Sequence, residues 1–422
     1  MKKLITAILV LVLVCQLTAV AFAAGDAVTI RFSWWGDEAR HNVTLASIEK
    51  FEAAYPNIKI EPEYMGWDGY HTKLKTQIAG GSAPDVMQTD VKEMPGIVSQ
   101  GKVFYDLNAL QIDRSGFDAK FVENWGTQDG AIIGLPTGTN GETSIFNAEM
   151  MTKASIPMDQ PLSWNDILEY GKKLKEQFPD SYMMLLDPNQ VELHILNAYI
   201  CQKIGTGKYG PGNIRNFSEE DLTEALTYID ELLAAEVLVP FEQSSVHSVN
   251  QMENPLWLTG KVAMYLNFTT HIASAQKNSP FEIATGLFPS LEGGKQSGII
   301  VQPAQLITIS ANTQHPEEAA LFVDFFFNNP DSQVALGLNR SVPAVQSARE
   351  LLASRGELNP VLNEAVNRAL ANIGETFDVL TYNGELVKIL VTAVEAVGYD
   401  TMTPAEAAAN AIKLIDAKLA EF

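Results

Sequence analysis

Hydrophobic and polar residues near the start of the chain follow two periods, one typical of strands and one typical of helices. Val28, Ile30 and Phe32 alternate with polar residues, which predicts a strand. Four further runs take the two periods in turn: a helix at 45–55, a strand at 58–60, a helix at 70–78 and a strand from Val86. Strands separated by helices indicate right-handed crossovers and a mostly parallel sheet, so we predict an α/β fold.

Helical patterns dominate the rest of the chain, and several of them begin with a recognisable cap. Three Ser or Thr residues stand three positions before an acidic residue, as in a capping box, and each precedes an amphipathic run. These pairs are Ser163 with Asp166, Ser218 with Asp221, and Thr403 with Glu406. Residues 299–310 resume a strand pattern, and Pro316 begins a further apolar helix.

Polar residues and aromatic rings stand where the first strands end. Trp35-Gly36-Asp37 follows the first strand, Trp67 follows the second, and Gln88-Thr89-Asp90 closes the third. Because ligands of parallel sheets bind beyond the carboxyl ends of the strands, we expect these groups on one rim. The Gly- and Thr-rich stretch 135–141 precedes an apolar strand and is expected to cross between two domains.

The first residues predict an export signal. Lys2 and Lys3 precede an apolar run at 4–17, and Ala21-Phe22-Ala23 offers a cleavage site, so residues 1–24 are predicted to be removed. The apolar run is too short for a membrane span, and no later segment has the roughly 18 apolar residues that a span requires. The protein is therefore expected to be exported, to the periplasm or to the cell surface.

Cysteine content, charge and length limit what the exported chain does. Cys15 allows a lipid anchor, but Leu13 and Val14 replace the small residues that normally precede a lipidated cysteine, so both alternatives stay open. Cys201 is the one other cysteine, and neither a disulfide nor a cysteine metal site is expected. The net charge of −22 argues against nucleic acid as a partner. About 400 residues remain after the signal, which suggests two domains.

Catalytic and cofactor motifs are missing or out of context. Gly205, Gly207 and Gly210 have the spacing of a dinucleotide fingerprint, but a helical pattern precedes them and Pro211 follows, so a loop is favoured. The six histidines lack metal-ligand spacing, and no nucleophile elbow, phosphate loop or calcium loop is present. We therefore predict no metal and no cofactor. A carboxylate pair for glycoside hydrolysis stays open, because such pairs are assembled in space.

Aromatic residues at the rim favour a saccharide ligand. Trp34 continues the first strand and is expected in the core, whereas Trp35 falls at the loop and is expected to stack on a sugar ring. For Trp67, stacking and packing are equally favoured. Aromatic faces bury the apolar side of a sugar ring, while nearby carboxylates and amides pair with its hydroxyls.

Ordered segments along the chain resemble the carbohydrate-binding solute-binding proteins of ABC importers, the family to which maltose-binding protein belongs. The segments that carry the resemblance are Trp34-Trp35-Gly36, 50–52, 55–60, 81–86, 260–264, 316–320 and 340–343. Trp35-Gly36 followed by Arg40-His41 looks most like members that take up plant-wall oligosaccharides, including pectin fragments. The resemblance implies a monomer that is not an enzyme, captures an oligosaccharide and delivers it to the membrane permease of the importer.

The resemblance also implies two discontinuous α/β lobes that close on the ligand by a hinge. Lobe one is expected at 26–139 plus 279–331, and lobe two at 140–278 plus 332–422. Together with Trp67, the ligand-binding positions that it implies are Trp35, Asp37, Arg40, His41, Thr89, Asp90, Thr139, Asn140, Asn267, Thr270, His271, Tyr382 and Asn383. Some relatives place an aromatic ring where Thr270 and His271 stand, which leaves the length of the ligand open. A secreted glycosidase and a sugar sensor that feeds a membrane receptor are the alternatives.

Overall fold

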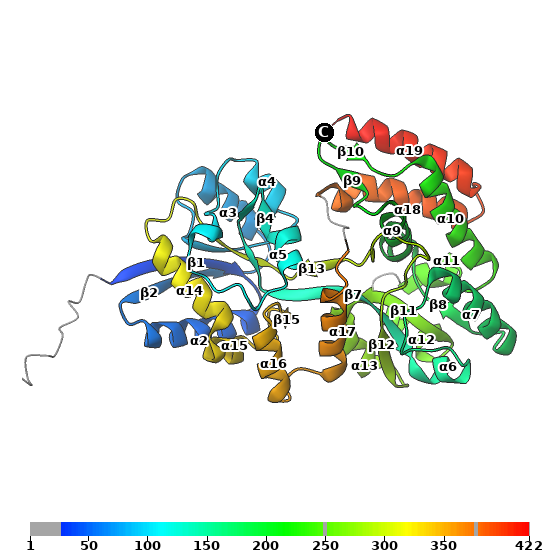
Figure 1. Cartoon of the computed structure of the whole chain (residues 1–422), viewed down its shortest axis with the longest axis horizontal. Coiled ribbons are helices and arrows are strands. Elements are labelled where there is room, and N and C mark those ends of the chain that lie inside the picture. Colours follow the sequence, from blue (N-terminus) through cyan, green and yellow to red (C-terminus); the bar gives the residue numbers. More distant parts are fainter. Residues whose placement is uncertain (1–26, 248–250, 375–378, 422) are drawn as a thin grey trace, which may run out of the picture.

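The computed structural model describes residues 27–247, 251–374 and 379–421. The predicted signal at 1–24, with Cys15, lies outside the described residues. The chain forms two lobes of helices packed on sheets, with β7 (Gly138–Asn147) running between them (Figure 1). The α/β fold class predicted from the two periods is confirmed.

A five-stranded sheet forms the centre of the first lobe. Its order is β2 (Ile58–Met65), β1 (Val28–Trp35), β3 (Val86–Thr89), β14 (Leu306–Ile309) and β6 (Leu135–Pro136). β1 pairs in parallel with β2 and β3, whereas β14 runs antiparallel to β3 and β6. The other elements here are α2 (Glu38–Ala54), α3 (Tyr70–Ala79), α4 (Met94–Val98), α5 (Ala119–Gly126), β4 (Thr127–Gln128), β5 (Ala131–Ile132), α14 (Pro316–Asn328), α15 (Pro330–Leu336) and α16 (Gln346–Ser354).

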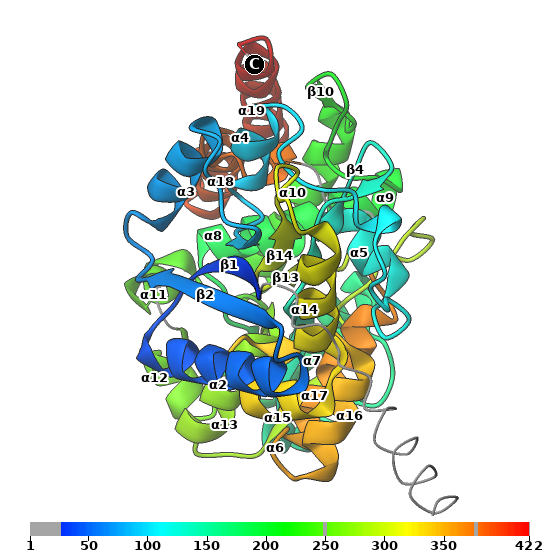
Figure 2. The ribbon, with the colours of Figure 1, turned by 90° about the vertical axis from the view of Figure 1, so that its left-hand side faces the viewer.

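The alternation along β1 sends its last two tryptophans to opposite faces of this sheet. Trp34 is fully buried among the residues that include Phe51 of α2, as its place in the strand predicted. Trp35 packs instead with Tyr70 and Leu74 of α3. Figure 2 shows α2 and α3 on the two sides of β2. The sheet therefore has a helical layer on each face.

The second lobe contains a sheet in which β12 (Ile283–Gly286), β7, β11 (Val262–Phe268) and β8 (Tyr182–Met184) are neighbours. Its other elements are α6 (Ala148–Lys153), α7 (Trp164–Gln177), α8 (Pro188–Val191), the π-helix η2 (Glu192–Leu196), α9 (Asn197–Ile204), β9 (Tyr209–Gly210), β10 (Ile214–Arg215), α10 (Glu219–Ala234), α11 (Phe241–Ser244), α12 (Pro255–Leu258), α13 (Ile272–Asn278), α17 (Pro360–Leu370), α18 (Gly384–Gly398) and α19 (Pro404–Leu419). All three predicted capping boxes are present, at the starts of α7, α10 and α19. Gly205 ends α9, and the short antiparallel pair β9–β10 follows it in place of the helix that a dinucleotide fingerprint needs.

Three chain segments pass side by side between the lobes. The first is β6 with β7, which belong to the two different sheets, as the stretch 135–141 predicted. The second is β13 (Val301–Pro303), which pairs with the start of β7 and leads into β14. The third is β15 (Val342–Pro343), which pairs with β7 at Gly138 and Thr139. The connection is therefore a narrow band of strands.

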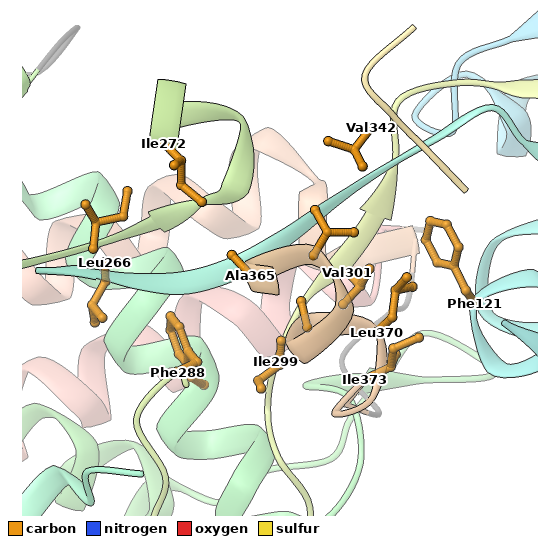
Figure 3. Close-up of a cluster of buried hydrophobic side chains, with 14 of the residues drawn as sticks. Phe121, Leu266, Ile272, Phe288, Ile299, Val301, Val342, Ala365, Leu370 and Ile373 are labelled. Atoms are coloured by element: carbon orange, nitrogen blue, oxygen red, sulfur yellow. The ribbon is translucent and has the colours of Figure 1, made fainter. Parts of the chain in front are cut away.

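Glycine lets these segments approach one another closely. A Cβ at Gly138 would lie 2.3 Å from the Arg340 carbonyl oxygen, and one at Gly141 would lie 2.3 Å from Ala369 Cβ in α17. Figure 3 shows the apolar cluster on both sides of this crossing, where Phe121 of α5 lies beside Leu370 of α17. The band of strands is therefore backed by a packed core, which limits the ways in which it can bend.

Two of the predicted lobe boundaries disagree with this packing. β12 pairs with β7 in the second sheet, so the chain returns to the first sheet only with β13 and β14, later than residue 279. After residue 331, α15 still packs on α2, where Ser47 and Ser332 share a buried hydrogen bond of 2.7 Å. Both differences arise from tertiary pairing, which local sequence patterns do not encode. The other lobe boundaries stay predictions.

Candidate functional site

The carboxyl ends of β1, β2 and β3 form one rim of the first lobe, because these strands run in the same direction. Residues 35–37, 65–67 and 89–90 stand at these ends. Thr137 directly follows β6 and Gln305 directly precedes β14, so both lie at the same edge. There the Thr137 hydroxyl donates to Gln305 Oε1 over 2.8 Å. The topology therefore gathers aromatic and polar residues from distant parts of the chain.

Trp35 and Trp67 differ in exposure although both belong to this rim. Trp35 is only 5% exposed, with its ring centroid 5.2 Å from that of Trp67 and 4.9 Å from that of His71. Trp67 is 50% exposed and covers the Trp35 indole edge-on. The expectation that Trp35 presents an open ring face therefore does not fit this structure, because Trp67 and His71 cover it. Trp67 is the exposed tryptophan of the rim.

Asp37 and Arg40 occupy the start of α2. Asp37 Oδ1 accepts a hydrogen bond from the Arg40 amide at 2.8 Å and so caps the helix. Gly36 leaves room for the Arg40 side chain, since a Cβ there would lie 2.7 Å from Arg40 Cδ. The Arg40 guanidinium reaches the carbonyl oxygens of Trp35 and Asn339 only at 3.5 and 3.4 Å. Burial lowers the pKa of Arg40, an effect that the nearby Asp37 carboxylate opposes.

His41 packs with an aromatic residue that we did not predict, Tyr64 at the end of β2. The Trp34 indole N–H donates to His41 Nδ1 over 3.1 Å. Tyr64 stacks on Trp34 with centroids 5.0 Å apart, its ring lies 4.5 Å from His41, and it is 46% exposed. An aromatic residue at a strand end was the signal used for Trp35, and it applied equally to Tyr64.

Thr89 and Asp90 end β3 beside the buried His71. Thr89 is fully buried, and among the described residues its hydroxyl has no hydrogen-bond partner; the same holds for His71 Nε2. Asp90 Oδ1 accepts a hydrogen bond from the Lys92 amide at 2.8 Å. Burial is the main cause of the lowered pKa of His71, and the nearby Glu93 and Asp90 carboxylates oppose it by raising that pKa.

A second rim lies at the carboxyl ends of β8 and β11, which pair in parallel. Asn267 Nδ2 donates to Tyr265 Oη over 2.7 Å, and Gln190 Nε2 donates to the same oxygen. Asp187 Oδ1 accepts the Gln190 amide, and its Oδ2 accepts from Gln251 Nε2 at 3.3 Å. Of these residues only Asn267 was predicted. The apolar run before Asp187 was the signal that would have identified the end of β8.

Asn140 and Thr270 meet at the crossing between the lobes. Asn140 Oδ1 accepts from the Thr270 amide at 3.2 Å, so β7 and the turn after β11 are joined there. Thr139 is fully buried, with a hydroxyl that has no partner in the described part of the chain. His271 follows Thr270. Burial is the main cause of its lowered pKa, and the nearby His194 lowers that pKa further.

Tyr382 and Asn383 stand directly before α18. Asn383 Oδ1 accepts the amides of Glu385 and Leu386 at 3.0 and 3.2 Å, which caps α18. The Tyr382 ring lies 6.4 Å from that of Trp125 in α5 of the first lobe. The Asn383 side-chain oxygen is therefore already used by the fold.

A buried arginine connects the third crossing segment to the first rim. Arg340 is 3% exposed and donates to Gln88 Oε1 and, at 2.8 Å, to Thr44 Oγ1 of α2. Gln88 Nε2 in turn donates to the Trp35 carbonyl oxygen at 3.2 Å. Burial and the neighbouring Arg40 lower the pKa of Arg340 to about 9.

A buried pair holds the first two crossing segments in the second lobe. Glu142 of β7 lies 2.7 Å from His194 Nδ1 in η2, and both side chains are buried. The other Glu142 oxygen accepts from the Ile300 amide at 2.7 Å, next to β13. Each lobe thus holds the connecting band through a buried, hydrogen-bonded side chain, Arg340 in the first lobe and Glu142 in the second.

In the described ranges, no group of three or more His, Cys, Asp and Glu side chains is arranged to hold a metal ion. Within the same ranges, none of the helices combines the length and the apolar character needed to cross a bilayer.

Comparison with known proteins gives a family for this arrangement. The family model described as bacterial extracellular solute-binding protein matches residues 40–333. A putative binding protein of Brucella abortus is 23% identical over 327 residues, 75% of this chain and 76% of that protein. The chain belongs to the bacterial extracellular solute-binding proteins, and the predicted resemblance is confirmed.

Three solved structures of two proteins are similar over nearly the whole chain. A periplasmic oligogalacturonide-binding protein from Yersinia enterocolitica has 29% identity and a TM-score of 0.84, with 93% of this chain and 99% of that chain covered. The same protein in complex with saturated digalacturonic acid aligns with a TM-score of 0.70. A de novo designed cysteine esterase has 30% identity and a TM-score of 0.87, covering 94% of this chain and 99% of that chain.

Proposed function

We propose that this binding protein captures an oligosaccharide between its two rims and delivers it to the permease of an ABC importer. One observation carries the proposal: an exposed tryptophan, Trp67, stands on a rim that also carries polar side chains. A second polar rim lies on the other lobe, and the crossing strands connect the two lobes. A sugar ring presents an apolar face to an indole and hydroxyls to amides such as Asn267, so the two chemistries complement each other.

The ligand we favour is an acidic oligosaccharide such as an oligogalacturonide. The relative from Yersinia enterocolitica is named for that ligand. Arg40 stands at the rim and the start of α2, where a uronate carboxylate gains from both the guanidinium and the helix dipole. A chain of net charge −22 repels an acidic ligand at a distance, so a local cation is needed to hold it.

Closure of the lobes is the proposed response to the ligand. The relative's complex with digalacturonic acid aligns less closely with this chain than its other structure does, with TM-scores of 0.70 and 0.84. That difference supports a relative orientation of the two lobes in this chain that differs from their orientation in the complex. A ligand shifts the lobes toward closure only if it binds the closed arrangement better.

Binding without turnover, as a monomer, is part of the proposal. The family is one of binding proteins, and the designed esterase shares the scaffold. A reducing-sugar assay separates the alternatives, since a glycosidase generates new reducing ends and a binding protein does not. A sugar sensor would bind in the same way, so cross-linking to the permease rather than to a receptor is the discriminating test.

Calorimetric titration with digalacturonate tests the ligand class. We expect binding to the wild-type protein, and a loss of about ten- to hundredfold for Arg40→Gln, because a charge-assisted hydrogen bond is removed. Neutral galactobiose serves as the control and should bind both proteins equally. Equal affinity of both proteins for digalacturonate would show that Arg40 does not contact the ligand. Tighter binding of galactobiose than of digalacturonate would show that the ligand is a neutral and not an acidic oligosaccharide.

A further inference from the structure

Two half-exposed aromatic rings stand at the tip of the edge strand β2, three positions apart. Tyr64 packs on the α2 side of the sheet, against Trp34 and His41, and is 46% exposed. Trp67 packs on the α3 side, against Trp35 and His71, and is 50% exposed. Three residues of extended backbone span about 10 Å at most, so the two rings flank one strand end.

The Tyr64 ring is held in a fixed orientation. Its plane makes an angle of 29° with that of Trp34, with centroids 5.0 Å apart, so one face is stacked. Trp34 is itself fully buried, so its indole cannot move aside. A rigid ring that remains half-exposed is an efficient stacking surface, because little side-chain entropy is lost when a partner binds.

His41 adds a hydrogen-bond donor of known orientation. Because the Trp34 indole N–H donates to Nδ1 over 3.1 Å, Nδ1 acts as an acceptor, and the proton of the neutral imidazole is on Nε2. Arg40 adjoins it, with two carbonyl contacts at 3.4 and 3.5 Å that are longer than ordinary N–H···O bonds. The remaining N–H groups of both side chains can donate to a ligand.

We infer that Tyr64 and His41 form a further sugar subsite, which takes a glycosyl unit of an oligosaccharide beyond the two units that reach Trp67 and Arg40. The apolar face of that unit stacks on Tyr64, and one of its hydroxyl or carboxylate oxygens accepts from His41 Nε2. The inference rests on the proposed function and deepens it. It makes the protein selective for chains of three or more units over disaccharides.

Titration with a length series tests this subsite. The probes are galacturonate and neutral galactan oligosaccharides of two, three and four units. We expect Tyr64→Leu to weaken binding of the three- and four-unit chains about three- to tenfold and to leave the two-unit affinity unchanged. Tyr64→Phe keeps the ring and should bind like the wild type. Tyr399→Leu is the matched control, a 40% exposed tyrosine in the second lobe that should change nothing.

The outcomes separate the subsite from the proposed function. A wild-type protein that binds none of the probes overturns both. A wild-type protein that binds, with Tyr64→Leu unaffected or weakened equally at every length, overturns the subsite alone. His41→Gln provides a second route if Tyr64→Leu does not fold, and it should weaken the longer chains selectively, whereas a uniform effect would contradict the inference.

Discussion

Single residues at the first rim have separable roles in binding and in stability. Trp67 is half-exposed, so Trp67→Ala should weaken binding of the glycan about three- to tenfold and leave the unfolding temperature unchanged. Trp35 is buried, so Trp35→Ala should cost about 3–5 kcal/mol of stability, as large cavities in cores do. Calorimetry and urea unfolding of the two variants measure both effects. Equal stability loss in both would contradict the assigned exposures.

Three histidines at the rims make the stability of the fold depend on pH. Burial, the largest cause for each, lowers the pKa of His41, His71 and His271 from the ordinary value of 6.5. Below that value the unfolded chain binds more protons than the folded protein, so stability falls as the pH falls toward the folded pKa values; above it, these groups have no effect.

Thermal unfolding at about pH 7.5 and about pH 5.5 measures this dependence. The wild-type protein should melt at a lower temperature at the acidic pH. A variant with glutamine at all three positions should lose part of that difference, because its side chains do not titrate. A variant that shows the same pH dependence as the wild type would remove these histidines as the cause.

The sequence predicted some residue environments and not others. The strand period predicted the burial of Trp34, because it reports which face of a sheet a residue occupies. Trp35 is buried by rings at positions 67 and 71, and no pattern within β1 reports that cover. Gln190 and Tyr265 are joined by a contact between α8 and β11, which no local pattern in either element reports.

At the scale of elements, the crossing strands depend on glycine. A methyl group at Gly138 would meet the Arg340 carbonyl oxygen of the third segment, which is backbone and cannot move aside cheaply. Gly138→Ala should therefore lower stability by about 1–3 kcal/mol in urea unfolding and weaken glycan binding as well. Gly384→Ala is the control, since nothing lies within 4 Å of a Cβ there. Equal stability of both variants would show that the segments can separate without cost.

Elements with strong local signals were predicted best. The three capping boxes begin helices because each supplies its own hydrogen bonds within four residues. β12 is four residues long and takes its place by pairing with β7, a long-range contact that the local patterns behind the predicted boundary at residue 279 did not report. Likewise, α15 stays with the first lobe because of its packing on α2.

At the scale of the whole molecule, two lobes are joined by a band that each of them holds firmly. Arg340 fixes the third segment to the first lobe, and the Glu142–His194 pair fixes the first two segments to the second lobe. We therefore expect bending to be concentrated between these anchors, near the start of β7. In the proposed closure the lobes move as units, which is how a hinge converts ligand contacts on both rims into closure.

Small-angle X-ray scattering with and without the tightest-binding oligosaccharide of the length series tests this account most directly. The account predicts that the radius of gyration falls at saturating ligand, because the two rims come together around the sugar. Calorimetry on the same samples establishes that the ligand is bound. Bound ligand with an unchanged scattering profile would contradict closure of the lobes.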